Sequence, residues 1–230
     1  MEIRRYIFLV FALVVGIPTC IAQEQKVTGP KKKQDTTTTH KTQPQTAQRP
    51  VVQAISTSQK VDLGLSVYWC GYNVGAHNPE EFGNYYAWAE NTTKSVYTQE
   101  SYKVNTDMTD IRGYDVLDAA REHMGDRWRL PTKEEYEELE KRCKWTYTQY
   151  KGINGYKVVG PNGKAIFFPF AGIKDDAIVN WQNMQGAYWC SNVFEDDRRY
   201  AWVINLTKGN YNLEFTHRYE GRSIRAVCTK

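Results

Sequence analysis

Four cysteines follow residue 60 of this chain, and their spacing limits the sulfur chemistry that they can do. Cys70, Cys143, Cys190 and Cys228 are separated by 38 residues or more, whereas zinc-binding cysteines come in closely spaced pairs. An even number of cysteines in an exported chain favours disulfide bridges, although four cysteines allow three connectivities. Cys70 and Cys190 each end a Tyr-Trp-Cys tripeptide in an expected strand. We therefore expect the bridges Cys70–Cys190 and Cys143–Cys228, and no metal bound by these thiols.

Other side chains that could do chemistry do not form a catalytic pattern. The four histidines are scattered along the chain, so no pairing with Ser, Cys or Asp follows from their order. Loop carboxylates occur at Asp175-Asp176 and at Glu195-Asp196-Asp197, and hard cations such as calcium prefer such ligands. Ion pairs with Arg198 and Arg199 are the simpler role for them. We expect no catalytic residue and no cofactor, with calcium as the alternative.

Aromatic residues are the strongest indication of a binding surface. The chain has 7 Trp, 16 Tyr and 8 Phe, and all but three of these follow residue 60. Such side chains stack on ligands or fill partner pockets, but the core of a sheet also needs them. We expect Trp69, Trp128, Trp189 and Trp202 in the core. The candidate ligand-binding residues lie near loops or strand ends: Trp181, Asn183, Asp196, Asp197, Tyr211 and Tyr219.

Two helices are expected to support these residues. Thr132 and Glu135 have the spacing of a capping box, which predicts a helix that begins after Thr132. Apolar residues then repeat on one face of this helix up to Cys143, so the cysteine sulfur should face the core. A shorter helix is expected over residues 114–124, with Gly125 as its natural stop.

Strands make up most of the rest. Alternating or aromatic-rich segments predict strands, and Asn162-Gly163 favours a hairpin turn. The long segments 91–112 and 171–186 are expected to be loops. The fold class is therefore α+β, with two helices packed on a twisted, mainly antiparallel sheet. The expected strands lie within 61–75, 84–90, 155–160, 164–168, 187–191, 200–206, 211–215 and 223–228.

The N-terminus has the pattern of an export signal. Two arginines precede an apolar run that is too short to span a membrane, and small residues precede an expected cleavage site after Ala22. Lipid attachment at Cys20 is the alternative. Residues 23–60 are rich in Thr, Gln, Lys and Pro, which predicts a disordered linker or stalk. We expect a signal peptide at 1–22, the linker at 23–60 and one domain at 61–230, with no transmembrane anchor after cleavage.

Charge separates the linker from the domain. The chain has a net charge of +4, of which residues 23–60 contribute +5, and residues 61–230 carry −2. A nucleic-acid-binding domain needs a basic excess on its folded surface. We therefore expect no nucleic acid among the partners of this protein.

Several short motifs occur in order along the domain. They are Val61-Asp62-Leu63-Gly64-Leu65, Asn73-Val74-Gly75-Ala76, Pro79-Glu80-Glu81-Phe82-Gly83 with Tyr86-Ala87-Trp88, Trp128-Arg129-Leu130-Pro131-Thr132, Asn154-Gly155-Tyr156-Lys157-Val158, Tyr188-Trp189 and Gly221-Arg222-Ser223-Ile224-Arg225. In this order they resemble the Fibrobacter succinogenes major paralogous domain of exported Bacteroidetes proteins, over most of residues 61–229. The resemblance implies a C-type-lectin-like fold related to formylglycine-generating enzymes, in which Arg129 and Arg225 are buried structural donors.

The expected function follows from this resemblance and from the lack of a catalytic pattern. We expect an exported, non-enzymatic binding or adhesion module that presents loops to a glycan or protein ligand on a host or bacterial surface. It would reside in the periplasm, on the outer surface or outside the cell. The alternatives are a formylglycine-generating-like oxidase and a structural envelope protein without a discrete ligand. The enzymatic relatives use two nearby thiols, but Cys190 and Cys228, the only late cysteines, lack close spacing.

Overall fold

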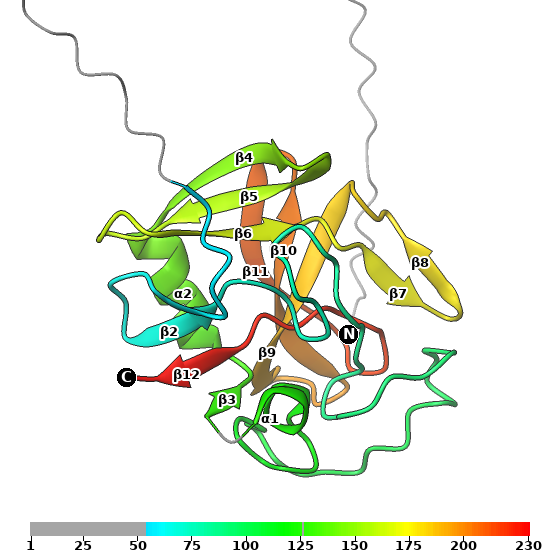
Figure 1. Cartoon of the computed structure of the whole chain (residues 1–230). Coiled ribbons are helices and arrows are strands. Elements are labelled where there is room, and N and C mark those ends of the chain that lie inside the picture. Colours follow the sequence, from blue (N-terminus) through cyan, green and yellow to red (C-terminus); the bar gives the residue numbers. More distant parts are fainter. Residues whose placement is uncertain (1–53, 126) are drawn as a thin grey trace, which may run out of the picture. The chain divides into compact units, whose positions relative to one another are not determined.

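The computed structural model describes residues 54–125 and 127–230. The expected signal peptide, Cys20 and most of the expected linker lie outside the described residues. In the described part, the chain is mainly β-sheet with two helices, compatible with the expected α+β class (Figure 1). None of the described helices has the length and apolar character needed to cross a membrane. The elements are β1 (Lys60–Asp62), β2 (Val67–Cys70), α1 (Ala119–Met124), β3 (Trp128–Arg129), α2 (Lys133–Arg142), β4 (Lys144–Tyr150), β5 (Ile153–Val159), β6 (Ala165–Pro169), β7 (Ile173–Asp175), β8 (Ile178–Asn180), β9 (Gln185–Val193), β10 (Tyr200–Thr207), β11 (Asn210–His217) and β12 (Val227–Thr229).

The strands form four small sheets in place of the single sheet that the sequence suggested. Their orders are β1-β2-β12-β3, β11-β10-β9, β4-β5-β6 and β7-β8. Every pair between these strands is antiparallel. Figure 1 shows β9, β10 and β11 near the centre of the domain, with α2 beside β4–β6 and α1 toward the opposite end.

The β9-β10-β11 sheet lies between two apolar clusters. Successive side chains of a strand point to opposite faces, so Tyr188 and Cys190 of β9 join one cluster and Trp189 joins the other. On β10, Ile204 belongs to the first cluster and Val203 to the second. Both faces of this sheet are therefore buried over much of its length, which explains the nearly continuous apolar sequence of β9.

Helix α2 begins as the sequence predicted. The Thr132 side chain accepts a hydrogen bond from the Glu135 backbone N–H, and the Glu135 carboxylate accepts one from the Thr132 N–H. The capping box is thus confirmed. Its buried face, which includes Tyr136 and Leu139, packs into the first cluster, and half-buried Cys143 packs beside it.

The expected roles of two arginines are also confirmed. Arg225 is fully buried and donates hydrogen bonds to the Asn73 Oδ1 atom and to the carbonyl oxygen atoms of Cys70 and Phe167. Arg129 donates two hydrogen bonds to the Glu135 carboxylate, which ties β3 to the start of α2.

Some expected elements differ from the structure. Segment 84–90 forms no strand and has only an isolated bridge between Tyr86 and Arg222, because its backbone runs across loops and not along a sheet edge. The expected loop 171–186 contains the β7–β8 hairpin, and β4 follows α2 where no strand was expected. Pairing also begins before residue 61: β1 starts at Lys60, and Ile55 bridges Ala165.

The four cysteines are free thiols in the structure, in place of the expected bridges. The physical reason is that the members of each expected pair lie in different apolar clusters. Cys143 and Cys190 belong to the first cluster, whereas Cys70 and Cys228 belong to the second. Each expected bridge would therefore have joined residues of different clusters.

Candidate binding site

A row of aromatic side chains crosses the outer end of β10 and β11. The register pairs Tyr200 with His217 and Trp202 with Phe215, so these four side chains share one face of the sheet. Phe194 stacks on Phe215 with ring centroids 4.0 Å apart, and Tyr200 stacks on His217 at 4.4 Å. We call the six connected rings the aromatic row: Phe194, Tyr200, Trp202, Phe215, His217 and Tyr219.

The aromatic row continues the apolar face of the sheet beyond the cover provided by α2. Farther along the same face, Ile204 and Leu206 are buried in the cluster that α2 helps to form. The Lys133 ammonium, at the first residue of α2, lies 3.8 Å from the centre of the Trp202 ring. Beyond this point the row is only partly covered, and Phe215 is 48% exposed. The other five rings are half-buried. Contiguous rings that are partly open to solvent in this way are typical of a binding surface.

A cavity of about 630 Å³ adjoins the His217 and Tyr219 end of the row. One wall comes from the long segment 91–112, and the other comes from the β9–β10 turn and the residues that follow β11. The residues that line the cavity are Gln99, Tyr102, Asp197, Arg198, Arg199, His217, Arg218 and Tyr219.

Arg218 is the most buried charged residue of this cavity, with only 8% of its surface exposed. Its Nη1 atom donates to the Arg198 carbonyl oxygen at 3.1 Å. Its Nε and Nη2 atoms meet no hydrogen-bond acceptor in the described part of the chain. The guanidinium lies 4.3 Å from the Trp88 ring centre and 5.4 Å from that of Tyr102. These ring faces offset part of the cost of burying a cation without an anion.

The rim of the cavity is charged and open to water. Arg199 pairs with Asp197, with its Nε atom 3.0 Å from a carboxylate oxygen, and these hydrogen bonds lower the pKa of Asp197 to about 2. Arg198 donates to the Asp107 carbonyl oxygen at 2.7 Å. Burial raises the pKa of Tyr102 to about 12, so its hydroxyl stays protonated and donates to the Trp88 carbonyl oxygen. At neutral pH the cavity therefore has three cationic side chains and one anionic side chain in its lining.

The structure divides the six expected ligand-binding residues among three places. Asp197 and Tyr219 line the cavity, and exposed Asp196 lies next to them in the β9–β10 turn. Tyr211 lies at the far end of β11, where it stacks on Trp145 with centroids 4.6 Å apart.

Trp181 and Asn183 lie away from that site, in the segment that follows β8. Trp181 is 55% exposed. Asn183 has a structural role, since its Oδ1 atom accepts a hydrogen bond from the Asn154 backbone N–H at 2.7 Å.

Most of the aromatic row was missed from the sequence. Trp202 was expected in the core but is only half-buried, and Phe194, Tyr200, Phe215 and His217 were not singled out. A signal was available: aromatic residues alternate in two neighbouring expected strands, and the Lys208-Gly209-Asn210 turn joins them into a hairpin. Pairing the two strands through that turn would have placed the rings on one face.

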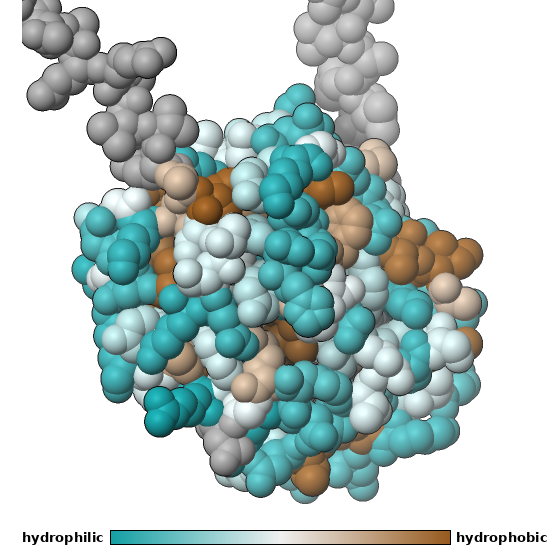
Figure 2. Space-filling model, viewed as in Figure 1, coloured by the Kyte–Doolittle hydropathy of each residue, from teal (hydrophilic) through white to brown (hydrophobic). Residues whose placement is uncertain are grey.

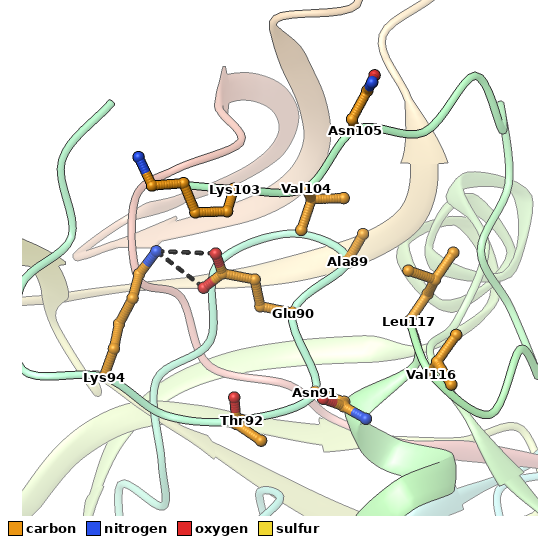
Figure 3. Close-up of a pocket in the computed structure, with 10 residues that line it drawn as sticks. All are labelled: Ala89, Glu90, Asn91, Thr92, Lys94, Lys103, Val104, Asn105, Val116 and Leu117. Atoms are coloured by element: carbon orange, nitrogen blue, oxygen red, sulfur yellow. Dashed lines mark hydrogen bonds and ion pairs between the residues drawn. The ribbon is translucent and has the colours of Figure 1, made fainter. Parts of the chain in front are cut away.

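A second hollow, of about 450 Å³, lies between the segments 89–94, 103–105 and 116–117 (Figure 3). Figure 3 shows Lys94 directed at Glu90, and the ion pair between them measures 2.8 Å. Val104, Val116 and Leu117 supply an apolar wall. The Lys94–Glu90 pair is neutral and Lys103 leaves one positive charge in the lining, so this hollow offers less to an anionic ligand than the cavity beside the aromatic row.

Two further features bear on ligands. Figure 2 shows an apolar patch over the β7–β8 hairpin, where Ile178 is 64% exposed. Among the described residues, no group of three or more His, Cys, Asp or Glu side chains could hold a metal ion. The calcium alternative therefore has no ligand cluster in this part of the chain.

Comparison with known proteins found no matching family model, no matching curated protein and no matching solved structure. The function is therefore inferred from the side chains of the chain itself.

Proposed function

We propose that this chain is an exported, non-enzymatic binding module that presents the aromatic row to a glycan. The observation that carries the proposal is the set of six contacting rings, left partly uncovered beyond Lys133 at the start of α2. Flat aromatic faces bind the apolar faces of sugar rings, and polar neighbours satisfy the hydroxyl groups. Glu195 lies beside the row, with its carboxylate 3.0 Å from the Trp202 Nε1 atom. Asp197 and Arg199 supply further polar groups at the other end.

The burial of the thiols supports a binding module over the oxidase alternative. Oxidase chemistry needs two reactive thiolates at one site, but Cys190 and Cys228 lie in different apolar clusters. Burial raises the pKa of Cys190 well above its ordinary value, and it also raises the pKa of Cys228. Thiols in such surroundings stay protonated and unreactive.

The family resemblance is part of the same proposal. The sequence motifs that carry the resemblance have structural roles. Trp128 and Arg129 form β3, and Thr132 caps α2. Arg225 donates hydrogen bonds to Asn73 and Phe167 and so connects their two segments. This supports a place for the chain in the major paralogous domain family, with a C-type-lectin-like fold that keeps its scaffold and varies its surface. Export, and residence in the cell envelope or outside the cell, belong to the proposal as well.

A glycan array with the full exported chain tests the proposed function. The wild-type chain should bind a subset of saccharides, and Phe215→Ser should weaken that binding by about tenfold, which corresponds to about 1.4 kcal/mol. Ile178→Ser is the matched control, because it also removes an exposed apolar side chain but lies on β8. It should leave binding unchanged.

Three outcomes would contradict the proposed function. One is the absence of saccharide binding, and another is saccharide binding that Phe215→Ser leaves intact. The third is a loss of binding on Ile178→Ser that matches the loss on Phe215→Ser.

A further inference from the structure

The cavity beside the aromatic row has an excess of positive charge within a domain that is negative overall. Arg198, Arg199 and Arg218 line it together with a single carboxylate, that of Asp197. Residues 61–230 have a net charge of −2. The lining therefore has an excess of positive charge, although burial and the nearby carboxylates of Glu220, Asp175 and Glu100 raise the pKa of Tyr219. An excess of positive charge in a concave lining attracts anions.

Arg218 gives the cavity a cation that no carboxylate neutralises. In the described part of the chain it forms no ion pair, and two of its nitrogen atoms lack an acceptor. Burial of a charged group without an opposite charge is costly, and the cost falls when an anion comes near. The guanidinium lies against the Trp88 and Tyr102 rings, and its Nη1 atom is bonded to the Arg198 carbonyl oxygen, so the charge stays at the cavity wall. Its field acts through surroundings of low polarity and is therefore weakly screened.

The exposed arginines at the rim can contact a ligand directly. The side chains of Arg198 and Arg199 are 50% and 75% exposed. Arg199 is paired with Asp197, so an incoming anion competes with that carboxylate. Arg198 makes its 2.7 Å hydrogen bond to the uncharged backbone oxygen of Asp107, and the Asp107 carboxylate lies farther away at 3.8 Å. Arg198 is therefore the freer of the two to bind an anion.

The cavity and the row share two rings. His217 and Tyr219 line the cavity, and their centroids are 5.0 Å apart in a stacked arrangement. A sugar that stacks on this end of the row therefore has the arginines within reach of its substituents.

We propose, building on the function proposed above, that the ligand is an acidic saccharide that carries a carboxylate or sulfate group. The sugar ring lies against Tyr219, on the side away from His217, and the oxyanion enters the cavity lined by Arg198, Arg199 and Arg218. Both kinds of ligand have an oxyanion attached to a saccharide. The test distinguishes a carboxylate from a sulfate.

The test compares saccharides that differ only in charge. The first pair is tetragalacturonate and its fully methyl-esterified form, and the second is a sulfated cello-oligosaccharide and its unsulfated form. Calorimetric titration of the full exported chain should give at least tenfold tighter binding for the acidic member of one pair. The advantage should shrink as salt is raised, because salt screens the attraction at the exposed rim.

Charge variants locate the effect. Arg198→Gln/Arg199→Gln should weaken binding of the acidic member far more than binding of the neutral member, and so remove most of the preference for the acidic member. Lys141→Gln/Arg142→Gln is the matched control, because it removes two exposed positive charges at the end of α2, away from the cavity. Arg218→Lys, which keeps the buried charge, should retain more of the preference than Arg218→Met.

The outcomes separate this inference from the proposed function. Equal binding of both members of each pair, still weakened by Phe215→Ser, would overturn the acidic ligand and leave the glycan-binding row intact. An acidic preference that the α2 control variant reduces as much as the cavity variant would also overturn it. If none of the four saccharides binds and the glycan array also shows no binding, the proposed function is overturned and the inference with it.

Discussion

The ion pair between Arg129 and Glu135 allows the scaffold under the site to be tested quantitatively. Arg129 Nη1 and Nη2 donate to the two carboxylate oxygens at 2.8 and 2.6 Å, and the two side chains are 16% and 13% exposed. Glu135→Gln keeps the shape of the side chain and one acceptor for the Thr132 N–H. It leaves the Arg129 guanidinium without an anion in a mostly buried place.

The expected loss follows from this geometry. Removing one partner of a buried ion pair costs about 3–5 kcal/mol, and the remaining exposure of the pair lowers that figure to about 2–3 kcal/mol. Glu137→Gln is the control on the same helix: Glu137 pairs with Lys141, and their side chains are 36% and 71% exposed. It should lower the free energy of unfolding by no more than about 0.5 kcal/mol.

Urea denaturation followed by tryptophan fluorescence measures both values. The double variant Arg129→Met/Glu135→Gln removes both charges, so it should lose less than the sum of the two single variants. Strict additivity would refute the reasoning, as would a Glu135→Gln variant no less stable than Glu137→Gln.

Three further predictions concern the core. Cys143 should react with iodoacetamide in the native chain at a rate that keeps rising toward pH 11, because burial raises the pKa of its thiol to about 11 from an ordinary value of 9.0; a plateau near pH 9 would speak against this. Arg225→Met should lower the free energy of unfolding by about 3–5 kcal/mol, because three buried acceptors lose their donor; a change below 1 kcal/mol in urea denaturation would show the network to be unimportant. Gly160→Ala should lower the melting temperature measured by calorimetry, because its added carbon would lie 2.1 Å from the Leu63 carbonyl oxygen; an unchanged melting temperature would contradict the close packing of these two segments.

Local signals predicted α2 and several hairpins well, whereas α1 begins at Ala119 and not near residue 114 as expected. The start of α2 depends on a capping interaction between Thr132 and Glu135, which are three residues apart, so the sequence alone contains it. The β5–β6 hairpin is specified in the same way by its turn, where Gly163 has a positive φ of 82°.

Features that depend on distant segments could not be predicted. The sequence pattern cannot show whether Tyr86 lies in a sheet, because that depends on the path of the distant segment that contains its bridge partner, Arg222. The cysteine positions are a similar case: Cys70 and Cys190 both follow Tyr-Trp, but the strands that contain them turn these sulfurs toward different clusters. The candidate site could be predicted only in part. Asp197 and Tyr219 were identified from the sequence as residues near loops, but Arg218 is identified only by its burial in the structure.

Hydrogen–deuterium exchange of the full chain, with and without a saturating saccharide identified on the glycan array, tests the central claim most directly. A ligand that covers the aromatic row should slow exchange in the peptides that span 194–202 and 213–219. The backbone around the β7–β8 hairpin and around residues 89–94 should exchange at the same rate in both states. Protection confined to either of those two regions, with none across 194–202 and 213–219, would contradict the account.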